Sequence, residues 1–147
     1  MSGRTLRQIR MVLPMEPDRE VEAGDTASRL AESVHMDPDR IDELRMAVHE
    51  AFINASEHSQ ASDGRVYVTF RLLGEQEPET IEVVVRDTGV GFSTEAVRGT
   101  IRKAPQGRPR KRGWGLTIMR RLMDEVEIQS GSEGTVVVMS KRIAPAS

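Results

Sequence analysis

Alternating apolar and polar residues predict a sheet whose strands each bury one face. Residues 65–72 alternate strictly, so the even-numbered apolar residues point to the same side. Turn-forming residues occupy 74–78 and the alternation resumes over 80–86, which predicts an antiparallel hairpin. Three more segments carry strand patterns: an edge strand over 6–13, ended by Pro14, and a final strand pair over 126–129 and 135–141.

Apolar residues spaced three or four apart predict helices over about 17–35, 38–58 and 116–124. Gly24 is a weak point in the first of these helices. The second has clear start signals, because Asp37 is a suitable N-cap and Pro38 then occupies the first helical position.

The second helix has an unusually wide apolar surface. One face carries Ile41, Leu44, Val48, Ala51, Phe52 and Ala55. Met46 and Ile53 lie on another side, so we expect this helix to be sandwiched between neighbours. A narrow polar lane remains, made of Glu43, Glu50, Asn54 and Glu57. The lane faces either water, as most polar helix faces do, or a ligand.

Asp87 has the same parity as Ile81, Val83 and Val85, so a continuing strand would project its carboxylate from the apolar side. There it could accept a hydrogen bond from an exocyclic amine such as that of adenine. The alternative is that Asp87, Gly89 and the residues around them simply make a turn.

A second glycine pair, Gly113 and Gly115, precedes the short helix. The pair is either a phosphate cradle or a plain helix entry, and the adjacent Lys111 and Arg112 favour phosphate. Upstream, 93–99 has the composition of a helical turn, whereas 99–112 carries six Lys or Arg residues and little apolar material. We therefore predict a mobile basic loop there.

Composition narrows the class of protein. The 147 residues suit one domain, and the formal net charge of −2 argues against a general nucleic-acid binder. Residues 16–57 hold 12 acidic and 4 basic residues, whereas 96–123 hold 9 basic residues and no acidic one. There is no cysteine and no apolar run long enough to span a membrane. We expect a cytoplasmic protein without membrane contact.

Three segments in this order resemble the boxes of the GHKL ATPase superfamily, which includes gyrase, Hsp90, histidine kinases and MutL. Residues 50–55 resemble the N box, 87–92 the G1 box and 113–119 the G2 box. Within the superfamily, nearly the whole chain is similar to the bacterial anti-sigma-factor serine/threonine kinases of the SpoIIAB and RsbW type.

The resemblance implies a Bergerat fold in a single domain over 1–147. This fold is an α/β (α+β) two-layer sandwich, in which helices cover one face of a mixed, mostly antiparallel sheet. ATP would lie between the helices and a lid at about 93–112.

The resemblance also assigns roles to individual residues. Asn54 would coordinate a Mg²⁺ ion that bridges the phosphates, and Glu50 would be the general base. Asp87 would bind the adenine amine, with Thr135 nearby through water. Lys111 or Arg112 would neutralise phosphate charge. The remaining residues would shape the pocket and the phosphate cradle: Gly89, Gly91, Gly113, Gly115, Leu116 and Thr117.

The function implied is an ATP-dependent serine/threonine kinase that acts as an anti-sigma factor, usually as a homodimer. It would phosphorylate a STAS-domain anti-anti-sigma protein and sequester a sigma factor once that antagonist is modified. One alternative is a nucleotide-binding module that sequesters its partner without phosphotransfer, although such a binder would not need Glu50. The other is a stand-alone histidine-kinase-like ATPase domain with a separate phosphoacceptor.

Overall fold

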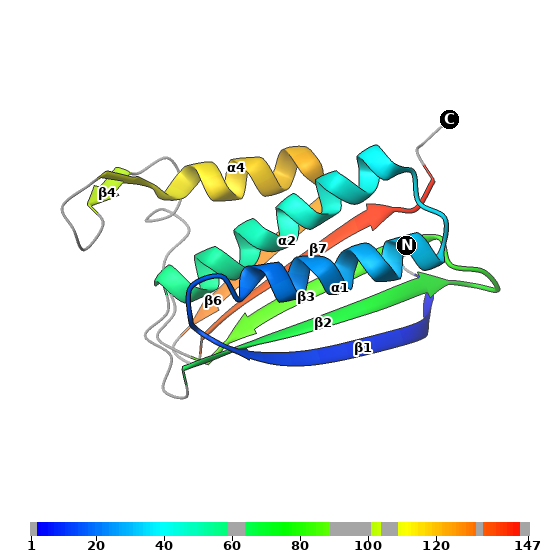
Figure 1. The fold of residues 1–147 in the computed structure, drawn as a ribbon, viewed down its shortest axis with the longest axis horizontal. Coiled ribbons are helices and arrows are strands. Elements are labelled where there is room, and N and C mark those ends of the chain that lie inside the picture. Colours follow the sequence, from blue (N-terminus) through cyan, green and yellow to red (C-terminus); the bar gives the residue numbers. More distant parts are fainter. Residues whose placement is uncertain (1–2, 59–63, 89–100, 104–108, 132–133, 145–147) are drawn as a thin grey trace.

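The computed structural model describes residues 3–58, 64–88, 101–103, 109–131 and 134–144. The helices are α1 (Glu20–Ser33), α2 (Pro38–His58) and α4 (Arg112–Leu122). The strands are β1 (Arg4–Pro14), β2 (Arg65–Gly74), β3 (Thr80–Asp87), β4 (Ile101–Lys103), β5 (Pro109–Lys111), β6 (Glu125–Gly131) and β7 (Gly134–Arg142). Figure 1 shows the three helices together on one face of the main sheet, which confirms the predicted α+β sandwich.

The main sheet has five strands in the order β1-β2-β3-β7-β6. Both predicted hairpins, β2–β3 and β6–β7, are confirmed, and β1 is an edge strand as expected. Among the described strands every pairing is antiparallel, so the sheet is simpler than the mixed one that we predicted. β7 lies between β3 and β6, so the last described strand is an interior strand of the sheet rather than an edge.

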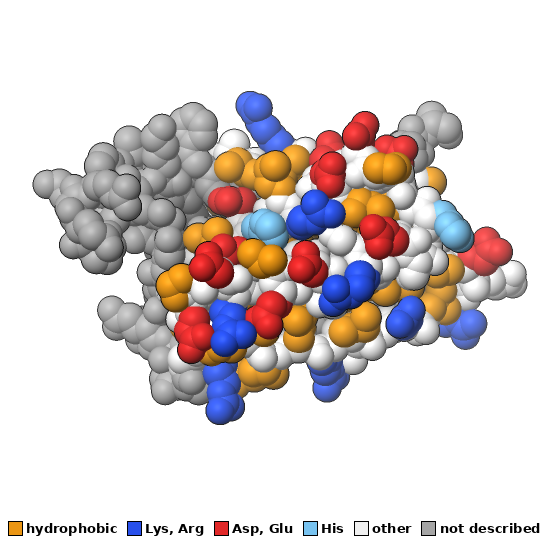
Figure 2. Space-filling view, in the orientation of Figure 1, with side chains coloured by type: hydrophobic (Ala, Val, Ile, Leu, Met, Phe, Trp, Pro, Cys, Tyr) orange, Lys and Arg blue, Asp and Glu red, His pale blue; other side chains and the backbone are white. Residues whose placement is uncertain are grey.

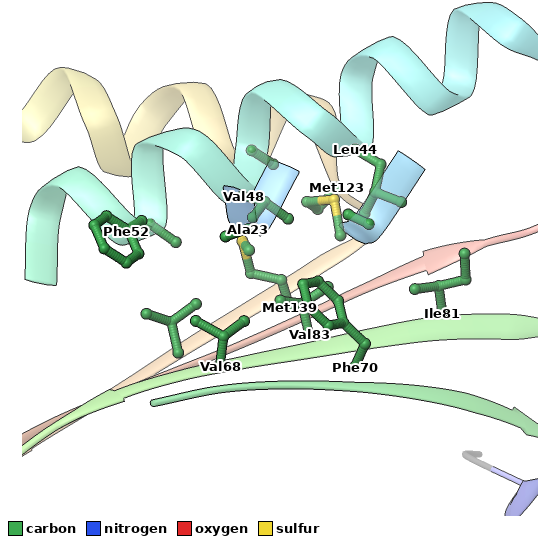
Figure 3. Packing of buried hydrophobic residues seen from close by; sticks show 14 of the residues in the cluster. Ala23, Leu44, Val48, Phe52, Val68, Phe70, Ile81, Val83, Met123 and Met139 are labelled. Carbon is green, nitrogen blue, oxygen red and sulfur yellow. The ribbon is translucent and has the colours of Figure 1, made fainter. Parts of the chain in front are cut away.

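The core lies between the sheet and α2. Figure 3 shows Leu44, Val48 and Phe52 of α2 above side chains from three strands: Val68 and Phe70 of β2, Ile81 and Val83 of β3, and Met139 of β7. All eight are at most 1% exposed. The helical and strand periodicities predicted from the sequence therefore meet in one core, whose burial is the main force holding the two layers together.

The central helix α2 packs against α1 as well as α4, which confirms that it is sandwiched. Its second apolar side was predicted wrongly, because Met46 is 52% exposed and Ile53 is only half-buried. The outer side of α2 faces solvent between its two neighbours, whereas Ala47, next to Met46 in the sequence, is fully buried. Within the described ranges, no helix is both long and apolar enough to cross a membrane.

Gly24 does not weaken α1, because its missing side chain is what allows α1 and α2 to approach. A Cβ atom at Gly24 would overlap Nε2 of His49 on α2. Next to it, Arg45 of α2 donates a 2.8 Å hydrogen bond to Oγ of Ser28, which is buried in α1. The unfavourable helix propensity of Gly24 is thus offset by the close packing that it allows between the two helices.

Two predictions about the basic segment need correction. The helix predicted at 116–124 begins earlier, at Arg112, so Gly113 and Gly115 lie in its first turn rather than in a loop. Residues 101–103 and 109–111, expected to be loop, pair as the antiparallel strands β4 and β5. Strand pairing needs only backbone N–H and C=O groups, so a segment with few apolar residues can still form a two-stranded sheet. The helical turn expected at 93–99 lies outside the described residues.

The far end of α4 is fixed to the rest of the molecule by a buried lysine. Lys141 of β7 is 3% exposed, and its Nζ donates to the carbonyl oxygen of Leu122 in the last turn of α4. The same ammonium lies 3.1 Å from a carboxylate oxygen of Glu43 on α2. This ion pair thus connects β7, α2 and the C-terminal end of α4, where a positive charge also complements the helix dipole.

Candidate functional site

Asp87 is the last residue of β3, and its side chain points toward the helices as its parity predicted. It is 2% exposed, and its backbone pairs with Val66 of β2 on one side and Thr135 of β7 on the other. A carboxylate is rarely buried this deeply unless it has a role or a partner. The position therefore suits an acceptor that selects one hydrogen-bond donor of a ligand.

Thr135 and Gly134 are fitted closely to Asp87. Thr135 is 3% exposed, and its Oγ1 lies 3.3 Å from Oγ of Ser130 on β6. Gly134 has a φ of +131°, and a Cβ there would overlap the backbone carbonyl oxygen of Asp87. Only glycine accommodates both the backbone conformation and the close approach. Gly134 thus sets the backbone position from which Asp87 projects.

We expect Gly134→Ala to lower the free energy of unfolding by about 1–3 kcal/mol and to weaken nucleotide binding, because the new methyl group displaces the Asp87 backbone. Gly131→Ala is the matched control in the same hairpin, since nothing lies within 4 Å of a Cβ at that position. Thermal unfolding and ATP titration would measure both effects. Equal behaviour of the two variants would contradict the positioning role of Gly134.

Glu50 and Asn54 lie one turn apart on α2, on the polar lane predicted from the sequence. Asn54 is 7% exposed and Glu50 is half-buried. The neighbouring Ala51, Phe52 and Ala55 are buried in the core, so this part of α2 is held firmly on the sheet. The lane is therefore not a freely solvated helix face at these positions.

The first turn of α4 contributes backbone rather than side-chain chemistry. Gly113 and Gly115 both lie in this turn, where the N–H groups have no partner within the helix. Leu116 is 5% exposed and joins the core, whereas Thr117 is exposed. Such N–H groups, together with the positive end of the helix dipole, favour an anion.

These parts come together at one end of the molecule. Figure 1 shows that the last turns of α2, the end of β3, the beginning of β7 and the first turn of α4 all lie on the same side. The buried carboxylate of Asp87, the pair of Glu50 and Asn54, and the start of α4 thus lie at the same end of the fold. Gly89 and Gly91 lie outside the described residues, and the side chains of Lys111 and Arg112 are likewise not described.

Comparison with known proteins shows the family of this chain. A profile of the histidine kinase-like ATPase domain matches residues 13–141. The chain belongs to this family. It is 37% identical to the anti-sigma F factor of Heyndrickxia coagulans over 117 residues, which cover 74% of this chain and 76% of that protein.

Other members of the family match nearly the full length. The serine-protein kinase RsbW of Bacillus velezensis is 32% identical over 144 residues, covering 90% of this chain and 84% of the relative. RsbW of Oceanobacillus iheyensis is 29% identical, with 92% and 87% covered. A solved structure of the RsbU and RsbW domains from Mycobacterium tuberculosis superposes with a TM-score of 0.67 at 21% identity, covering 95% of this chain and 34% of that one. That structure supports the fold alone.

Membership of the histidine kinase-like ATPase domain family implies that the ligand is ATP. A nucleotide with its phosphates needs a base selector at one side and anion-binding groups at the other. Asp87 is buried at the end of β3, and the first turn of α4 lies at the same end of the fold. Among the described residues, no three His, Asp or Glu side chains gather into a metal cluster of their own.

Sequence reasoning missed Lys141, although a signal was available. Lys141 shares its parity in β7 with Thr135, Val137 and Met139, all of which are buried against the helices. The strict alternation of the strand therefore places the lysine inside. Its partner Glu43 stood on the polar lane of α2, so the part of the lane farthest from Asn54 makes a structural ion pair.

Proposed function

We propose that this chain is an ATP-dependent serine/threonine protein kinase that acts as an anti-sigma factor. The observation that carries the proposal is the buried carboxylate of Asp87, at the same end of the fold as Glu50, Asn54 and the first turn of α4. Relatives named serine-protein kinase RsbW and anti-sigma F factor support both the reaction and the regulatory role.

Asp87 accepts a hydrogen bond from the exocyclic amine of adenine, and Thr135 contacts the base through water. The support for this role is the burial of both side chains beside each other on β3 and β7. In a site shielded from water, a charge-assisted hydrogen bond distinguishes adenine from a base without the amine. Gly89 and Gly91 then allow the backbone to pass close to the nucleotide.

The phosphates bind at the first turn of α4, where Gly113 and Gly115 leave N–H groups accessible. Leu116 fixes this turn in the core, and Thr117 borders it on the exposed side. Lys111 or Arg112, immediately before or at the start of α4, neutralises phosphate charge. The excess of basic residues over 96–123 supports this assignment.

Asn54 holds Mg²⁺ through its amide oxygen. Hard oxygen ligands suit this ion, which usually takes one or two protein ligands and keeps phosphate oxygens and water as the others. When bound, the ion offsets the negative charge that develops on the transferred phosphoryl group.

Glu50 acts as the general base. Its carboxylate accepts the proton of the attacking serine or threonine hydroxyl, whose oxygen forms a bond to the γ-phosphorus of ATP. The bond between that phosphorus and the β–γ bridging oxygen breaks, and ADP leaves. Because Glu50 is half-buried one turn from Asn54, the base and the metal ligand lie on the same face of α2.

The substrate is a STAS-domain anti-anti-sigma protein, and the sequestered partner is a sigma factor, bound once the antagonist is phosphorylated. We also propose that the protein acts in the cytoplasm, without direct contact to nucleic acid or membrane. We further propose that residues 1–147 form one domain with a lid at about 93–112, and that the protein is a homodimer.

Incubation with γ-labelled ATP, Mg²⁺ and a STAS-domain protein tests this function. We expect label on a serine or threonine of the STAS protein, lost when EDTA removes Mg²⁺. Failure of the chain to bind ATP would overturn the whole proposal. Binding without transfer would instead support a switch module, and label on histidine would support the stand-alone histidine-kinase-like domain.

A further inference from the structure

The last residue of α4 and the turn after it are tied to the end of β7 by three directional contacts. Nζ of Lys141 donates to the carbonyl oxygen of Leu122, where α4 ends. The backbone N–H of Asp124 donates a 2.9 Å hydrogen bond to the carbonyl oxygen of Ser140. The Asp124 carboxylate in turn accepts a 2.7 Å hydrogen bond from the backbone N–H of Arg142. We call these three contacts the α4 anchor.

Helix α2 reinforces the α4 anchor. A carboxylate oxygen of Glu43 lies 3.1 Å from Nζ of Lys141, and Arg40 donates a 2.6 Å hydrogen bond to the carbonyl oxygen of Arg142. The guanidinium of Arg40 also lies 3.8 Å from the Asp124 carboxylate. The anchor is therefore part of one polar network that joins α2, β7 and the end of α4.

The α4 anchor lies at the end of the sheet opposite to Asp87. Lys141 pairs with Ile81 near the beginning of β3, whereas Asp87 is the last residue of that strand. The strand from residue 81 to residue 87 spans about 20 Å. Lys141 is therefore too far from the candidate nucleotide site to touch a ligand bound beside Asp87. Any effect of Lys141 on such a ligand has to pass through α4, which Figure 1 shows running from the end that holds Asp87 back over the sheet.

The buried side chains of α4 and the residue that follows Leu122 are suited to holding the helix down but not to fixing it lengthwise. Leu116, Met119 and Met123 are all at most 5% exposed and belong to the core. Apolar contacts have no direction, and methionine side chains adapt easily to small shifts of their surroundings. The directional contacts of the α4 anchor therefore decide where α4 lies along its own axis.

Position at one end of α4 determines position at the other. The helix has 11 residues, Arg112–Leu122, and is about 16 Å long. Its backbone hydrogen bonds make it a rigid rod over this length, so a shift of Leu122 along the axis moves the first turn with it. That first turn holds the N–H groups without a partner inside the helix.

Stability alone does not explain a lysine at position 141. Lys141 is 3% exposed, and burying an ammonium carries a desolvation cost that its partners only balance. An apolar residue would continue the pattern of Val137 and Met139 on the same side of β7. What the ammonium adds is a directed hydrogen bond to one carbonyl group, at the end of α4 where the helix dipole favours a cation.

We propose that Lys141 is a positioning residue for the nucleotide phosphates, which acts by fixing where α4 lies along its axis. The inference rests on the proposed function, in which the phosphates bind at the first turn of α4. Lys141 touches neither the nucleotide nor the protein substrate. Without its ammonium, α4 shifts on its apolar contacts and the first turn no longer matches the phosphates. The adenine contact of Asp87 is unaffected, because Asp87 is held by strand pairing on both sides.

Lys141→Met tests this role, because it removes the ammonium and keeps an unbranched apolar side chain. We expect the affinity for ATP to fall about 10-fold, because the phosphates lose their alignment with the first turn of α4. The affinity for adenosine should stay that of the wild-type protein, because adenosine has no phosphates. Calorimetric titration with ATP and Mg²⁺ and NMR titration with adenosine measure the two affinities. A role in stability alone would leave both affinities of the folded variant unchanged.

Glu43→Gln is the conservative counterpart of Lys141→Met. The new amide oxygen can still accept a hydrogen bond from Lys141, and the contact of Lys141 with the Leu122 carbonyl is untouched. The ratio of ATP affinity to adenosine affinity should therefore be that of the wild-type protein. A loss as large as that of Lys141→Met would assign the effect to the charge of Glu43 rather than to the contact with α4, and would overturn the proposal.

Phosphotransfer gives a kinetic readout of the same role. Lys141→Met should lower kcat about 10- to 100-fold, because small misplacements of a reacting group have effects of this size. The KM for the STAS substrate should be unchanged, since the anchor lies away from the proposed nucleotide end. A change confined to that KM would contradict a role in positioning the phosphates.

Hydrogen exchange gives a readout that needs no nucleotide. The backbone N–H groups of α4 should exchange faster in Lys141→Met than in the wild-type protein, because the helix has lost a contact that fixes it. Those of α1 should keep their rates, since the α4 anchor and its support come from α2, α4, β7 and the turn after α4. Unchanged exchange throughout α4 would overturn the proposal.

Two control variants separate the position of α4 from charge and from stability. Arg29→Met removes one positive charge from an exposed position on α1. Figure 2 shows charged side chains spread over the helical side of the molecule, so one fewer should leave both affinities unchanged. Leu13→Ala creates a cavity beside the edge strand β1 and should lower the unfolding temperature by several degrees without changing the ratio of the two affinities.

Lys141→Gln decides the question if Lys141→Met fails to fold. Its amide is one atom shorter than the lysine side chain and carries no charge, so it should show the same selective loss of ATP affinity. A folded variant of Lys141 that binds ATP like the wild-type protein, or that loses ATP and adenosine affinity by the same factor, would overturn the positioning role. Either result leaves the proposed function intact, because the wild-type protein still binds ATP. A wild-type protein that binds no ATP would instead overturn the proposed function, and the role of Lys141 with it.

Discussion

Glu50→Gln should lower the rate of phosphotransfer to the STAS substrate by about 10²–10⁴-fold, the usual contribution of a general base. The amide has the shape of the carboxylate but cannot take the proton of the attacking hydroxyl. ATP affinity should stay unchanged, because Glu50 acts on the second substrate. Rapid-quench measurement of labelled product, alongside ATP titration, checks both parts.

Asp42→Asn is the matched control for Glu50→Gln. Asp42 lies on the same helix, and its side chain is 67% exposed. Its substitution therefore removes one negative charge from α2 but leaves the residues of the polar lane unchanged. We expect this variant to retain wild-type rates. If Glu50→Gln also retained them, Glu50 would not be the base, and the hydroxyl would lose its proton to another acceptor.

Asp87→Asn should weaken ATP binding by about 10- to 100-fold, because hydrogen bonds to charged groups contribute about 1.5–3 kcal/mol. The side chain keeps its volume, and the backbone of Asp87 is paired on both sides. The fold should therefore survive, as a thermal melt without ligand would verify. Calorimetric titration with ATP gives the affinity.

Inosine triphosphate shows whether Asp87 contacts the base. This nucleotide has a carbonyl in place of the adenine amine, so the wild-type protein should bind it more weakly than ATP. Asp87→Asn should lose much of that preference, because an amide can donate to the carbonyl. A variant that kept the full preference for ATP would remove Asp87 from the adenine contact.

Local periodicity predicted most of this architecture. The parity of β3 placed Asp87 on the buried side, and the helical period of α2 placed Glu50 and Asn54 on one lane. Both predictions depend only on repeats of two and 3.6 residues, which the backbone enforces regardless of context. Both hairpins followed in the same way from strand patterns separated by turn residues.

Features that depend on neighbouring elements were not predictable in this way. Met46 is exposed because two helices flank α2 and leave its outer side in solvent, and nothing in the α2 sequence records where they lie. The prediction that Gly24 weakens its helix failed for the same reason. The space beside Gly24 is filled by His49, which comes from another helix. The roles of the predicted site residues stay predictions, because they concern a bound nucleotide.

The placement of β7 between β3 and β6 has a consequence for synthesis on the ribosome. Asp87 and Thr135 are neighbours in the sheet but far apart in the sequence, so their pairing waits until β7 has left the exit tunnel. The β1–β2–β3 portion can pair earlier, with β3 still lacking a neighbour on one side. A nascent chain therefore completes the backbone pairing of Asp87 only after β7 has been made, and products truncated before β7 lack that pairing.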